Sequence, residues 1–352
     1  MKRWLIYGSG KTGSLIAQEA VRSGETPLLV GRSAEKVKPI AEKLGLDWAV
    51  AEVSDKAGLS NLLEQADLVV HTAGPFLSTS MPMIQACLAK GKHYLDISNE
   101  IPVFQSVFKL DDEARRRGVA LIPGIGFGVA ATDGLGGYVA TQIKNPQELE
   151  IATHIYSEDS SVGADVTRLE ALSRGGWARR NGTLIRIPLG SGGIRLEFPF
   201  GNQTILPIPS GDLEAAFRST GVPNITTYGT FSISPLIARL ALPVVQRIVS
   251  ISGIRQRLEQ RISKRANAPV KRKAIQESHS YAWARARNSQ GDVFEAWQEM
   301  GEGYNFTAQA AVRAVQKVLS EPLTGALTPS QAFGTDFALL MNGTRRYIPA
   351  KG

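Results

Sequence analysis

The sequence predicts an α/β protein: a doubly wound parallel sheet joined to a second, α+β domain. Apolar runs alternate with helical patterns through the first 123 residues, a glycine loop follows the first run, and the pattern changes near residue 148. Such alternation is typical of βαβ units, in which helices cover both faces of a parallel sheet. We expect domains at 1–135 and 136–304, with residues 305–352 forming a helix and tail that pack back on the first domain.

The elements of the first domain follow one another at short intervals. Strands are expected at 3–7, 26–30, 47–53, 67–72, 92–97 and 119–123, and helices at 11–23, 33–44, 56–65, 79–90 and 102–117. In open sheets of this kind, a ligand lies across the carboxyl ends of the strands. The residues that directly follow each strand are therefore the candidates for a binding site.

A glycine loop follows the first strand. Gly8, Gly10 and Gly13 have G-x-G-x-x-G spacing, and a helical pattern begins at Lys11. The first glycine allows a tight turn, the second lets a pyrophosphate approach the backbone, and the third lets the helix pack closely on the strand. The helix amino terminus then offers N–H groups to the phosphates. The residues expected to contact this dinucleotide are Gly8, Ser9, Gly10, Lys11, Thr12 and Gly13.

The residues after the second strand indicate which dinucleotide binds. An acidic residue is usual here in NAD sites, where it binds the ribose hydroxyls, whereas this chain has Gly31, Arg32 and Ser33. Glycine removes the repulsion of a 2′-phosphate, the guanidinium can pair with that phosphate, and the hydroxyl can donate to it. Lys36 adds positive charge one turn later. The sequence therefore predicts NADP as the cofactor.

The next two strand ends add further candidates for cofactor contacts. Ser54 and Asp55 follow the third strand and would meet the adenine or its ribose. The turn after the fourth strand is built from small residues and then a stiff, aromatic pair, which suits a close approach to the nicotinamide end. Its candidates are Thr72, Ala73, Gly74, Pro75 and Phe76.

Two carboxylates follow the fifth strand and are the catalytic candidates. Asp96 or Glu100 could relay a proton at the hydride-transfer end of the site. An equally open alternative is that Asp96 caps a turn and Glu100 starts a helix. After the sixth strand, Phe127 is expected to line a pocket floor, and Thr132 or Asp133 to cap a helix over 133–143.

Several of these motifs resemble a known family. The strings YGSGKTG, GRS, HTAGPF, ACLAKGKHYLDISNE and GVALIPGIGFGVAATDGLG resemble the NADP-binding domain of saccharopine dehydrogenase-like oxidoreductases, in particular the trans-acting enoyl reductases. Later stretches, IPSGDLEAAFRSTGVPNI and TPSQAFGTDF, are also similar to that subgroup. The chain departs from its usual motifs within 9–13, at Asn99 and at 127–129.

The resemblance implies an enzyme that transfers a hydride from NADPH to a C=C or C=N bond of a small or lipid-like substrate. Phe127, Asp133 and Arg218 are the candidates for substrate contact, although Arg218 could instead anchor its loop. The alternative function is a non-catalytic NADP sensor, because no acid–base pair is unambiguous in the sequence.

The amino-acid composition indicates the cellular compartment of the protein and the ligands that it is expected to lack. The single cysteine, Cys87, excludes an intrachain disulfide and favours a reducing compartment. The four histidines are scattered, so we expect no metal site. No apolar run reaches the roughly 18 residues of a membrane span. We therefore expect a cytoplasmic protein, with peripheral membrane attachment left open.

The second domain is expected to be rich in strands. Strand patterns occur at 149–156, 183–188, 194–200 and 203–207, a helical pattern at 164–173, and a hairpin is expected from 275–287 and 293–300. A last helix is expected at 307–319. The second domain would cover the nicotinamide and pair two subunits through its sheet, which predicts a homodimer.

The net charge of +8 comes from one segment. Residues 234–273 carry ten basic side chains against Glu259, a net charge of +9, and apolar residues recur there at helical spacing. A charge confined to one segment argues against general nucleic-acid binding. The segment is expected to be either a solvated helical hairpin or an amphipathic surface for an anionic membrane or an acidic carrier protein.

Overall fold

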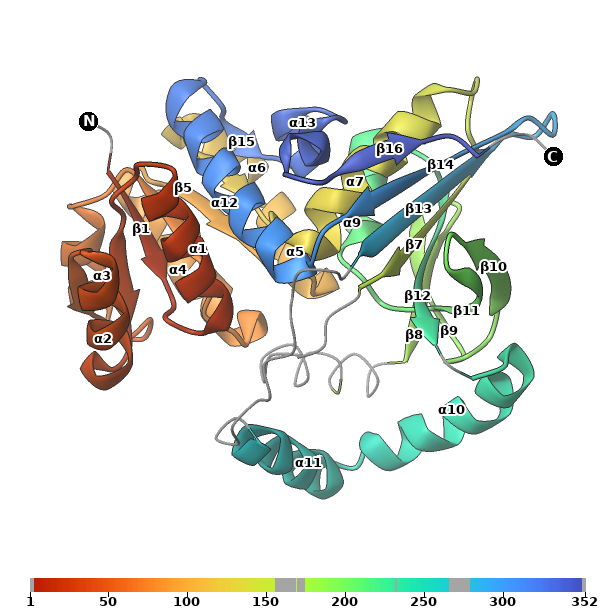
Figure 1. Cartoon of the computed structure of the whole chain (residues 1–352), viewed down its shortest axis with the longest axis horizontal. Coiled ribbons are helices and arrows are strands. Elements are labelled where there is room, and N and C mark those ends of the chain that lie inside the picture. Colours follow the sequence, from red (N-terminus) through yellow and green to blue (C-terminus); the bar gives the residue numbers. More distant parts are fainter. Residues whose placement is uncertain (1–2, 156–168, 170–174, 232, 266–278, 350–352) are drawn as a thin grey trace. The chain divides into compact units, whose positions relative to one another are not determined.

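The computed structural model describes residues 3–155, 169, 175–231, 233–265 and 279–349. The chain divides into two compact units, one formed by residues 1–134 with 303–344 and the other by residues 135–302 with 345–352. The first unit contains a parallel sheet and the second a mixed sheet (Figure 1). The predicted fold class, a doubly wound sheet with a second α+β domain, is confirmed.

The parallel sheet of the first unit has the order β15-β6-β5-β4-β1-β2-β3. Its strands are β1 (Trp4–Tyr7), β2 (Leu28–Gly31), β3 (Trp48–Val50), β4 (Leu68–His71), β5 (His93–Asp96), β6 (Ala120–Ile122) and β15 (Gly325–Ala326). Six of them occur where strands are predicted. The seventh, β15, has only two residues and pairs with β6, so it leaves no strand pattern in the sequence.

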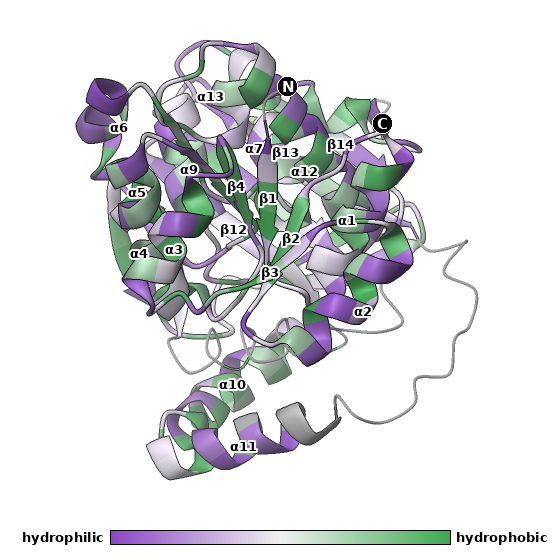
Figure 2. Cartoon of the chain, turned by 90° about the vertical axis from the view of Figure 1, so that its left-hand side faces the viewer, coloured by the Kyte–Doolittle hydropathy of each residue, from purple (hydrophilic) through white to green (hydrophobic). Residues whose placement is uncertain are grey.

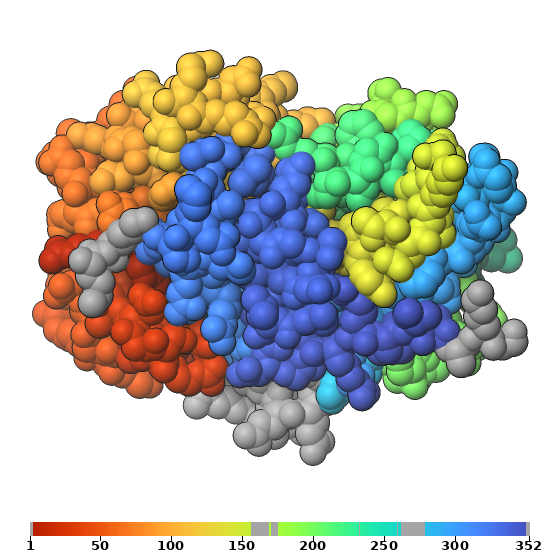
Figure 3. Space-filling view, turned by 90° about the horizontal axis from the view of Figure 1, so that it is seen from above, coloured from red at the N-terminus to blue at the C-terminus, as the bar shows by residue number. Residues whose placement is uncertain are grey.

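Helices form two layers on this sheet. They are α1 (Lys11–Arg22), α2 (Ala34–Leu44), α3 (Lys56–Leu63), α4 (Phe76–Lys90), α5 (Ile101–Phe108), α6 (Asp111–Arg117), α12 (Gly303–Ser320) and α13 (Pro329–Phe333), followed by the 3-10 turn η2 (Phe337–Leu340). Figure 2 shows α3 to α6 on one side of the sheet and α1, α2 and α12 on the other. In Figure 3, the blue C-terminal segment is packed against red and orange N-terminal residues, which includes the contact of α12 with α1.

Two helix predictions in this unit are wrong in their bounds. The helix predicted over 102–117 is interrupted, because α6 begins anew at three acidic residues and ends in three arginines, an order that complements the helix dipole. The helix predicted to start at Asp133 is α7 (Phe127–Thr141), which begins six residues earlier. Thr132 does not cap it, since its hydroxyl donates to the carbonyls of Gly128 and Val129 within the helix.

The core of the first unit lies between the sheet and its helices. Leu5, Val69, Tyr94 and Leu121 are completely buried, one from each of four neighbouring strands. Buried on both faces, these strands read as continuous apolar runs, and this is why the sequence predicts them well.

The sheet of the second unit has the order β10-β11-β12-β7-β13-β14-β16, with β8 and β9 branching from β12. Its strands are β7 (Glu148–His154), β8 (Gly176–Arg180), β9 (Thr183–Ile187), β10 (Ile194–Phe198), β11 (Gly201–Pro207), β12 (Asn224–Phe231), β13 (Ser280–Arg287), β14 (Val293–Met300) and β16 (Arg345–Tyr347). The pair β12–β7 is parallel, and the other strand pairs described in this sheet are antiparallel. The predicted β13–β14 hairpin is confirmed.

Aromatic residues fill the core of this sheet, and three helices complete the described part of the unit. The core cluster contains Phe198, Tyr228, Tyr281, Trp283 and Trp297. The helices are α9 (Asp212–Thr220), α10 (Pro235–Val249) and α11 (Ser252–Arg265). The helix predicted over 164–173 and the basic run at 271–273 lie outside the described residues.

Candidate functional site

The strand order of the first unit reverses next to β1. From β1 the chain continues to β2 and β3 on one side, and then to β4, β5 and β6 on the other. Ligands of open parallel sheets bind outside the carboxyl ends of the strands at such a reversal. The residues that follow β1, β2 and β4 are therefore placed at the expected site.

The glycine loop after β1 has different surroundings at each glycine. Gly8 has φ +125°, and the Thr72 hydroxyl crowds it while donating to the carbonyls of Tyr7 (3.2 Å) and Gly8 (3.1 Å). Gly13 lies directly against the Gly8 carbonyl, where a Cβ would clash. In contrast, among the described residues, none beyond the immediate chain neighbours of Gly10 has an atom within 4 Å of the position that a Cβ would occupy there. The loop is thus closely packed at Gly8 and Gly13 and open at Gly10, the glycine that a pyrophosphate would approach.

Helix α1 begins in this loop without a side-chain cap. Gly10 is its N-cap residue, and it makes no side-chain cap bond to the first turn. Those N–H groups and the positive end of the helix dipole therefore suit an anion. The Lys11 ammonium lies 3.8 Å from the ring centroid of Tyr304, so the start of α12 also adjoins the loop.

The end of β2 presents positive side chains. Gly31 lies against Ser9, because a Cβ at residue 31 would be 2.9 Å from the Ser9 Oγ atom. Arg32 and Lys36 are exposed, and Ser33 is the N-cap residue of α2 without making a side-chain cap bond. Arg32 also lies near the end of β1. Burial raises the pKa of Tyr7, the carboxylate of Glu52 raises it further, and the Arg32 guanidinium opposes both effects.

The candidates after β3 are engaged in local contacts. The Asp55 carboxylate caps α3 by accepting from the backbone N–H groups of Ala57 (3.1 Å) and Gly58 (3.0 Å). The Ser54 hydroxyl donates to Glu52 at 3.4 Å. Both residues follow β3, as predicted, but Asp55 also has a plain structural role, which a capping pattern before a helix could have indicated.

The turn after β4 is fixed by its own hydrogen bonds. The carbonyl of Ala73 accepts from the Thr79 hydroxyl at 2.7 Å and lies 3.1 Å from the Nε2 atom of His71. The peptide bond between Gly74 and Pro75 is cis, and α4 begins directly afterwards at Phe76. The Phe76 ring meets the imidazole of His71 edge to face, with centroids 5.4 Å apart. The predicted candidates from Thr72 to Phe76 thus form one ordered turn.

Behind this turn lies a buried chain of polar side chains that the sequence did not predict. The Nδ1 atom of His71 is 3.1 Å from the Tyr94 hydroxyl, which is 2.9 Å from the Oδ2 atom of Asp96. His71 and Asp96 are completely buried. The sequence does contain a histidine and an aspartate at the ends of two adjacent buried strands, and these residues pair in the sheet. Metal-ligand spacing alone does not reveal such a pair.

The hydrogen bonds of this chain determine where its protons lie. The Ala73 carbonyl can only accept, so the Nε2 atom of His71 carries a proton. Burial lowers the pKa of His71 to about 4, so the ring is neutral and its Nδ1 atom faces the Tyr94 hydroxyl. That hydroxyl donates to the Oδ2 atom of Asp96. Burial raises the pKa of Asp96, although its hydrogen bonds act in the opposite direction.

The other oxygen of Asp96 shapes the loops around it. Its Oδ1 atom accepts from the backbone N–H of Ser98 (2.9 Å), the Ser98 hydroxyl (2.6 Å) and the backbone N–H of Gly124 (3.0 Å). Glu100 is largely buried, and its Oε2 atom accepts from the backbone N–H of Asn99 at 2.8 Å. These contacts fit the alternative in which both carboxylates shape turns, and a proton-relay role for either remains a prediction.

The three substrate candidates belong to both units. In the first unit, the Phe127 backbone N–H donates to the Thr307 hydroxyl, and its ring packs on Phe306 with centroids 5.5 Å apart. Asp133 is completely buried and accepts from the backbone N–H of Ser330 at 2.7 Å. Arg218 is in α9 of the second unit. Asp133 therefore connects α7 to α13. The spacing of residues in the sequence could not predict this contact.

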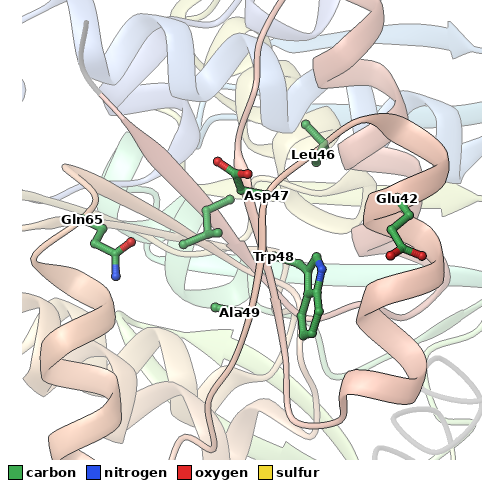
Figure 4. Close-up of a pocket in the computed structure, with 7 residues that line it drawn as sticks. Glu42, Leu46, Asp47, Trp48, Ala49 and Gln65 are labelled. Atoms are coloured by element: carbon green, nitrogen blue, oxygen red, sulfur yellow. The ribbon is translucent and has the colours of Figure 1, made fainter.

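A shallow pocket of about 540 Å³ lies elsewhere on the first unit (Figure 4). Leu28 and Trp48, which begin β2 and β3, contribute to its lining. It is thus at the amino ends of the strands, opposite to the edge that carries the glycine loop, and is not the predicted site. Within the described residues, no group of three or more His, Cys, Asp or Glu side chains is placed to hold a metal ion.

Comparison with known proteins identifies the first domain. Residues 4–122 match the family model of the saccharopine dehydrogenase NADP binding domain. This part of the chain is similar to the NADP-binding domain of saccharopine dehydrogenases. The predicted cofactor, NADP, is thereby confirmed, as is the resemblance stated from the motifs.

Curated relatives agree over the same region. The chain is 28% identical over 145 residues to the human saccharopine dehydrogenase-like oxidoreductase, which covers 35% of this chain and 34% of that protein. It is 29% identical over 138 residues to the trans-acting enoyl reductase of Mycobacterium tuberculosis H37Rv, covering 37% of this chain and 33% of that protein. The chain thus spans about a third of the length of the curated relatives it matches.

Two solved structures share the fold. Saccharopine dehydrogenase (L-Glu forming) from Saccharomyces cerevisiae has a TM-score of 0.64 at 12% identity, covering 99% of this chain and 100% of that one. Homospermidine synthase from Legionella pneumophila, crystallised with NAD, has a TM-score of 0.65 at 11% identity, covering 99% and 91%. At these identities the likeness establishes the fold alone.

Proposed function

We propose that this protein is an NADP-dependent oxidoreductase that transfers a hydride from NADPH to a C=C or C=N bond of a small or lipid-like substrate. The observation that carries the proposal is the glycine loop of an NADP-binding domain, open at Gly10 and placed where the strand order reverses. The similarity to a trans-acting enoyl reductase favours a C=C bond. NADPH would supply the hydride, and the protein would hold the cofactor and manage the accompanying proton.

Arg32, Ser33 and Lys36 would bind the 2′-phosphate of the cofactor. Both cations are exposed at the end of β2, and the Ser33 hydroxyl is not used to cap α2. A guanidinium pairs with a phosphate through two parallel hydrogen bonds, which makes it the strongest candidate of the three.

The substitution Arg32→Ala tests this assignment. Since a hydrogen bond to a charged group contributes about 1.5–3 kcal/mol, the variant should bind NADPH roughly 10- to 100-fold more weakly, with little change for NADH. The measurement is a fluorescence titration of both cofactors. Arg117→Ala, which removes an exposed arginine from the end of α6, is the matched control and should bind both as the unaltered protein does. Equal NADPH affinity in the Arg32 and Arg117 variants would contradict the assignment.

The proton step would depend on the residues after β5. Glu100 remains the better candidate for direct proton transfer, because Asp96 is completely enclosed by Tyr94, Ser98 and Gly124. Asp96 would act as a positioning residue that supports the turn after β4 through Tyr94 and His71.

NADPH oxidation measured against a panel of enoyl thioesters and cyclic imines tests the activity. The substitution Glu100→Gln tests whether Glu100 supplies the proton, because an unchanged turnover and pH profile would exclude that role.

A specific observation favours a second candidate, a non-catalytic NADP sensor. Both carboxylates predicted to be catalytic make local hydrogen bonds and are largely buried. A sensor would bind NADPH tightly yet oxidise none of it with any substrate of the panel. Cofactor binding without turnover would thus support the sensor over the enzyme.

We further propose a cytoplasmic homodimer that pairs through the mixed sheet of the second unit. Its outer strands β10 and β16 each pair with one neighbour in that sheet order, and strand edges of this kind can add a second copy. Sedimentation equilibrium would give the mass in solution: a monomer at micromolar concentration would exclude the dimer.

A further inference from the structure

Helix α10 exposes a continuous apolar stripe. Ile237, Leu240, Val244 and Ile248 follow one another at intervals of three or four residues, and so they share one face of the helix. Each of these side chains is between 48% and 69% exposed. The opposite side already packs on its own unit through the buried Ala238 and Val249. The stripe is therefore a second apolar face that the core of the unit does not use.

The stripe is bordered by positive charge. Arg247 is exposed and lies one turn from Val244 and next to Ile248, directly beside the stripe. Exposed arginines also occur at residue 239 and, on α11, at residues 257 and 261. Residues 235–265 contain seven basic residues and one acidic residue, a net charge of +6. Figure 2 shows the resulting alternation of hydrophobic and hydrophilic colours along α10 and α11.

The lengths of these helices indicate how such a surface would be used. Within the described residues, no single helix is long and apolar enough to cross a membrane, and α10 with its 15 residues is only about 22 Å long. The two helices reach the required composition only together, and the chain bends by 94° between them. A helix with one apolar face, a basic border and too little length for a span suits a position parallel to a membrane surface.

We propose that α10 lies flat on an anionic lipid bilayer, with the stripe from Ile237 to Ile248 inserted among the acyl chains and the arginines at the headgroups. Lipid satisfies both properties of the surface, because apolar tails and negative headgroups occur at the depths that the helix needs. A second copy of the same face would bring like charges together, since α10 and α11 carry one acidic residue between them. The proposal is independent of the catalytic activity.

The test is co-sedimentation of the full chain with vesicles of phosphatidylcholine alone and with added phosphatidylserine, at low and high salt. We expect binding to the anionic vesicles that weakens with salt. Arg247→Gln combined with Arg257→Gln should weaken it roughly 25-fold, since each basic residue near an anionic surface contributes about five-fold. Arg116→Gln with Arg117→Gln removes the same charge from α6 and should leave binding unchanged.

Leu240→Ser combined with Val244→Ser should weaken binding to anionic vesicles by at least about ten-fold, because it removes two inserted side chains. Val293→Ser, at another exposed apolar residue of the second unit, is the control and should have no effect. The absence of binding to anionic vesicles would overturn the proposal. So would a concentration-dependent dimer that dissociates on the α10 substitutions, or binding of an acidic carrier protein in place of vesicles.

Discussion

Each unit contains a buried polar cluster among its described residues, and the two clusters differ in whether their members can titrate. In the first unit, His71, Tyr94 and Asp96 form a hydrogen-bonded chain in which the Tyr94 hydroxyl donates to Asp96. In the second unit, Arg179 forms an ion pair of 2.8 Å with Glu214. Its Nε atom also donates to the Leu213 carbonyl (2.9 Å) and its Nη1 atom to that of Gly182 (2.7 Å).

The difference shows what each cluster can do. An arginine keeps its proton in proteins, so a buried guanidinium must have partners on every side, and here they join α9 to β8 and the turn after it. The Arg179 cluster is accordingly a fixed clamp. The members of the His71 chain can gain or lose protons, and they support the turn beside the expected cofactor site. Breaking the two clusters should therefore have different consequences.

The largest effect is expected from Arg179→Ala. Removing one partner leaves the Glu214 carboxylate buried without its counter-ion, which typically costs about 3–5 kcal/mol. Urea titration should show this loss in the free energy of unfolding. Arg186→Ala, at an exposed arginine over Trp177 on the neighbouring strand, should cost below about 1 kcal/mol.

The double substitution Arg179→Met with Glu214→Leu sharpens the same prediction. Because it removes both charges, it should be much less destabilising than Arg179→Ala. If the double variant loses as much stability as the single one, the clamp depends on the carbonyl contacts and not on the ion pair.

Neither cluster could be predicted from the sequence, although the surrounding elements could. The strands β1, β4 and β5 and the glycine loop have local signals: apolar runs, glycine spacing and a helical pattern. Arg179 and Glu214 are separated by 35 residues and His71 and Tyr94 by 23, and no periodicity relates them. The candidate site was therefore predicted where it follows strand ends, and missed where its support comes from side chains within the strands.

The pH dependence of stability should report on the cluster of His71, Tyr94 and Asp96. Burial lowers the pKa of His71 from 6.5 to about 4, so the unfolded chain binds a proton at a higher pH than the folded chain does. The contribution of His71 is therefore fully present above pH 6.5 and is lost as the pH falls towards 4, by up to about 3 kcal/mol.

Comparison with His71→Asn isolates this effect. The difference in the free energy of unfolding between the two proteins should change across pH 6.5 to 4 and stay constant above that window. The raised pKa of Asp96 acts in the opposite direction within each protein, and it largely cancels in the difference. A constant difference over the whole range would mean that folding does not lower the pKa of His71.

The smallest effect, and the most discriminating, concerns Asp96. If its carboxyl is protonated, Asp96→Asn reproduces it: the amide N–H donates to Tyr94 while the amide oxygen accepts from Ser98 and Gly124. The variant should lose less than about 1 kcal/mol, whereas Asp96→Ala leaves two buried backbone N–H groups unpaired and should lose about 2 kcal/mol. Equal losses on urea titration would indicate an ionised Asp96. A stable Asp96→Asn variant that also retained turnover would assign Asp96 to positioning and leave Glu100 to supply the proton.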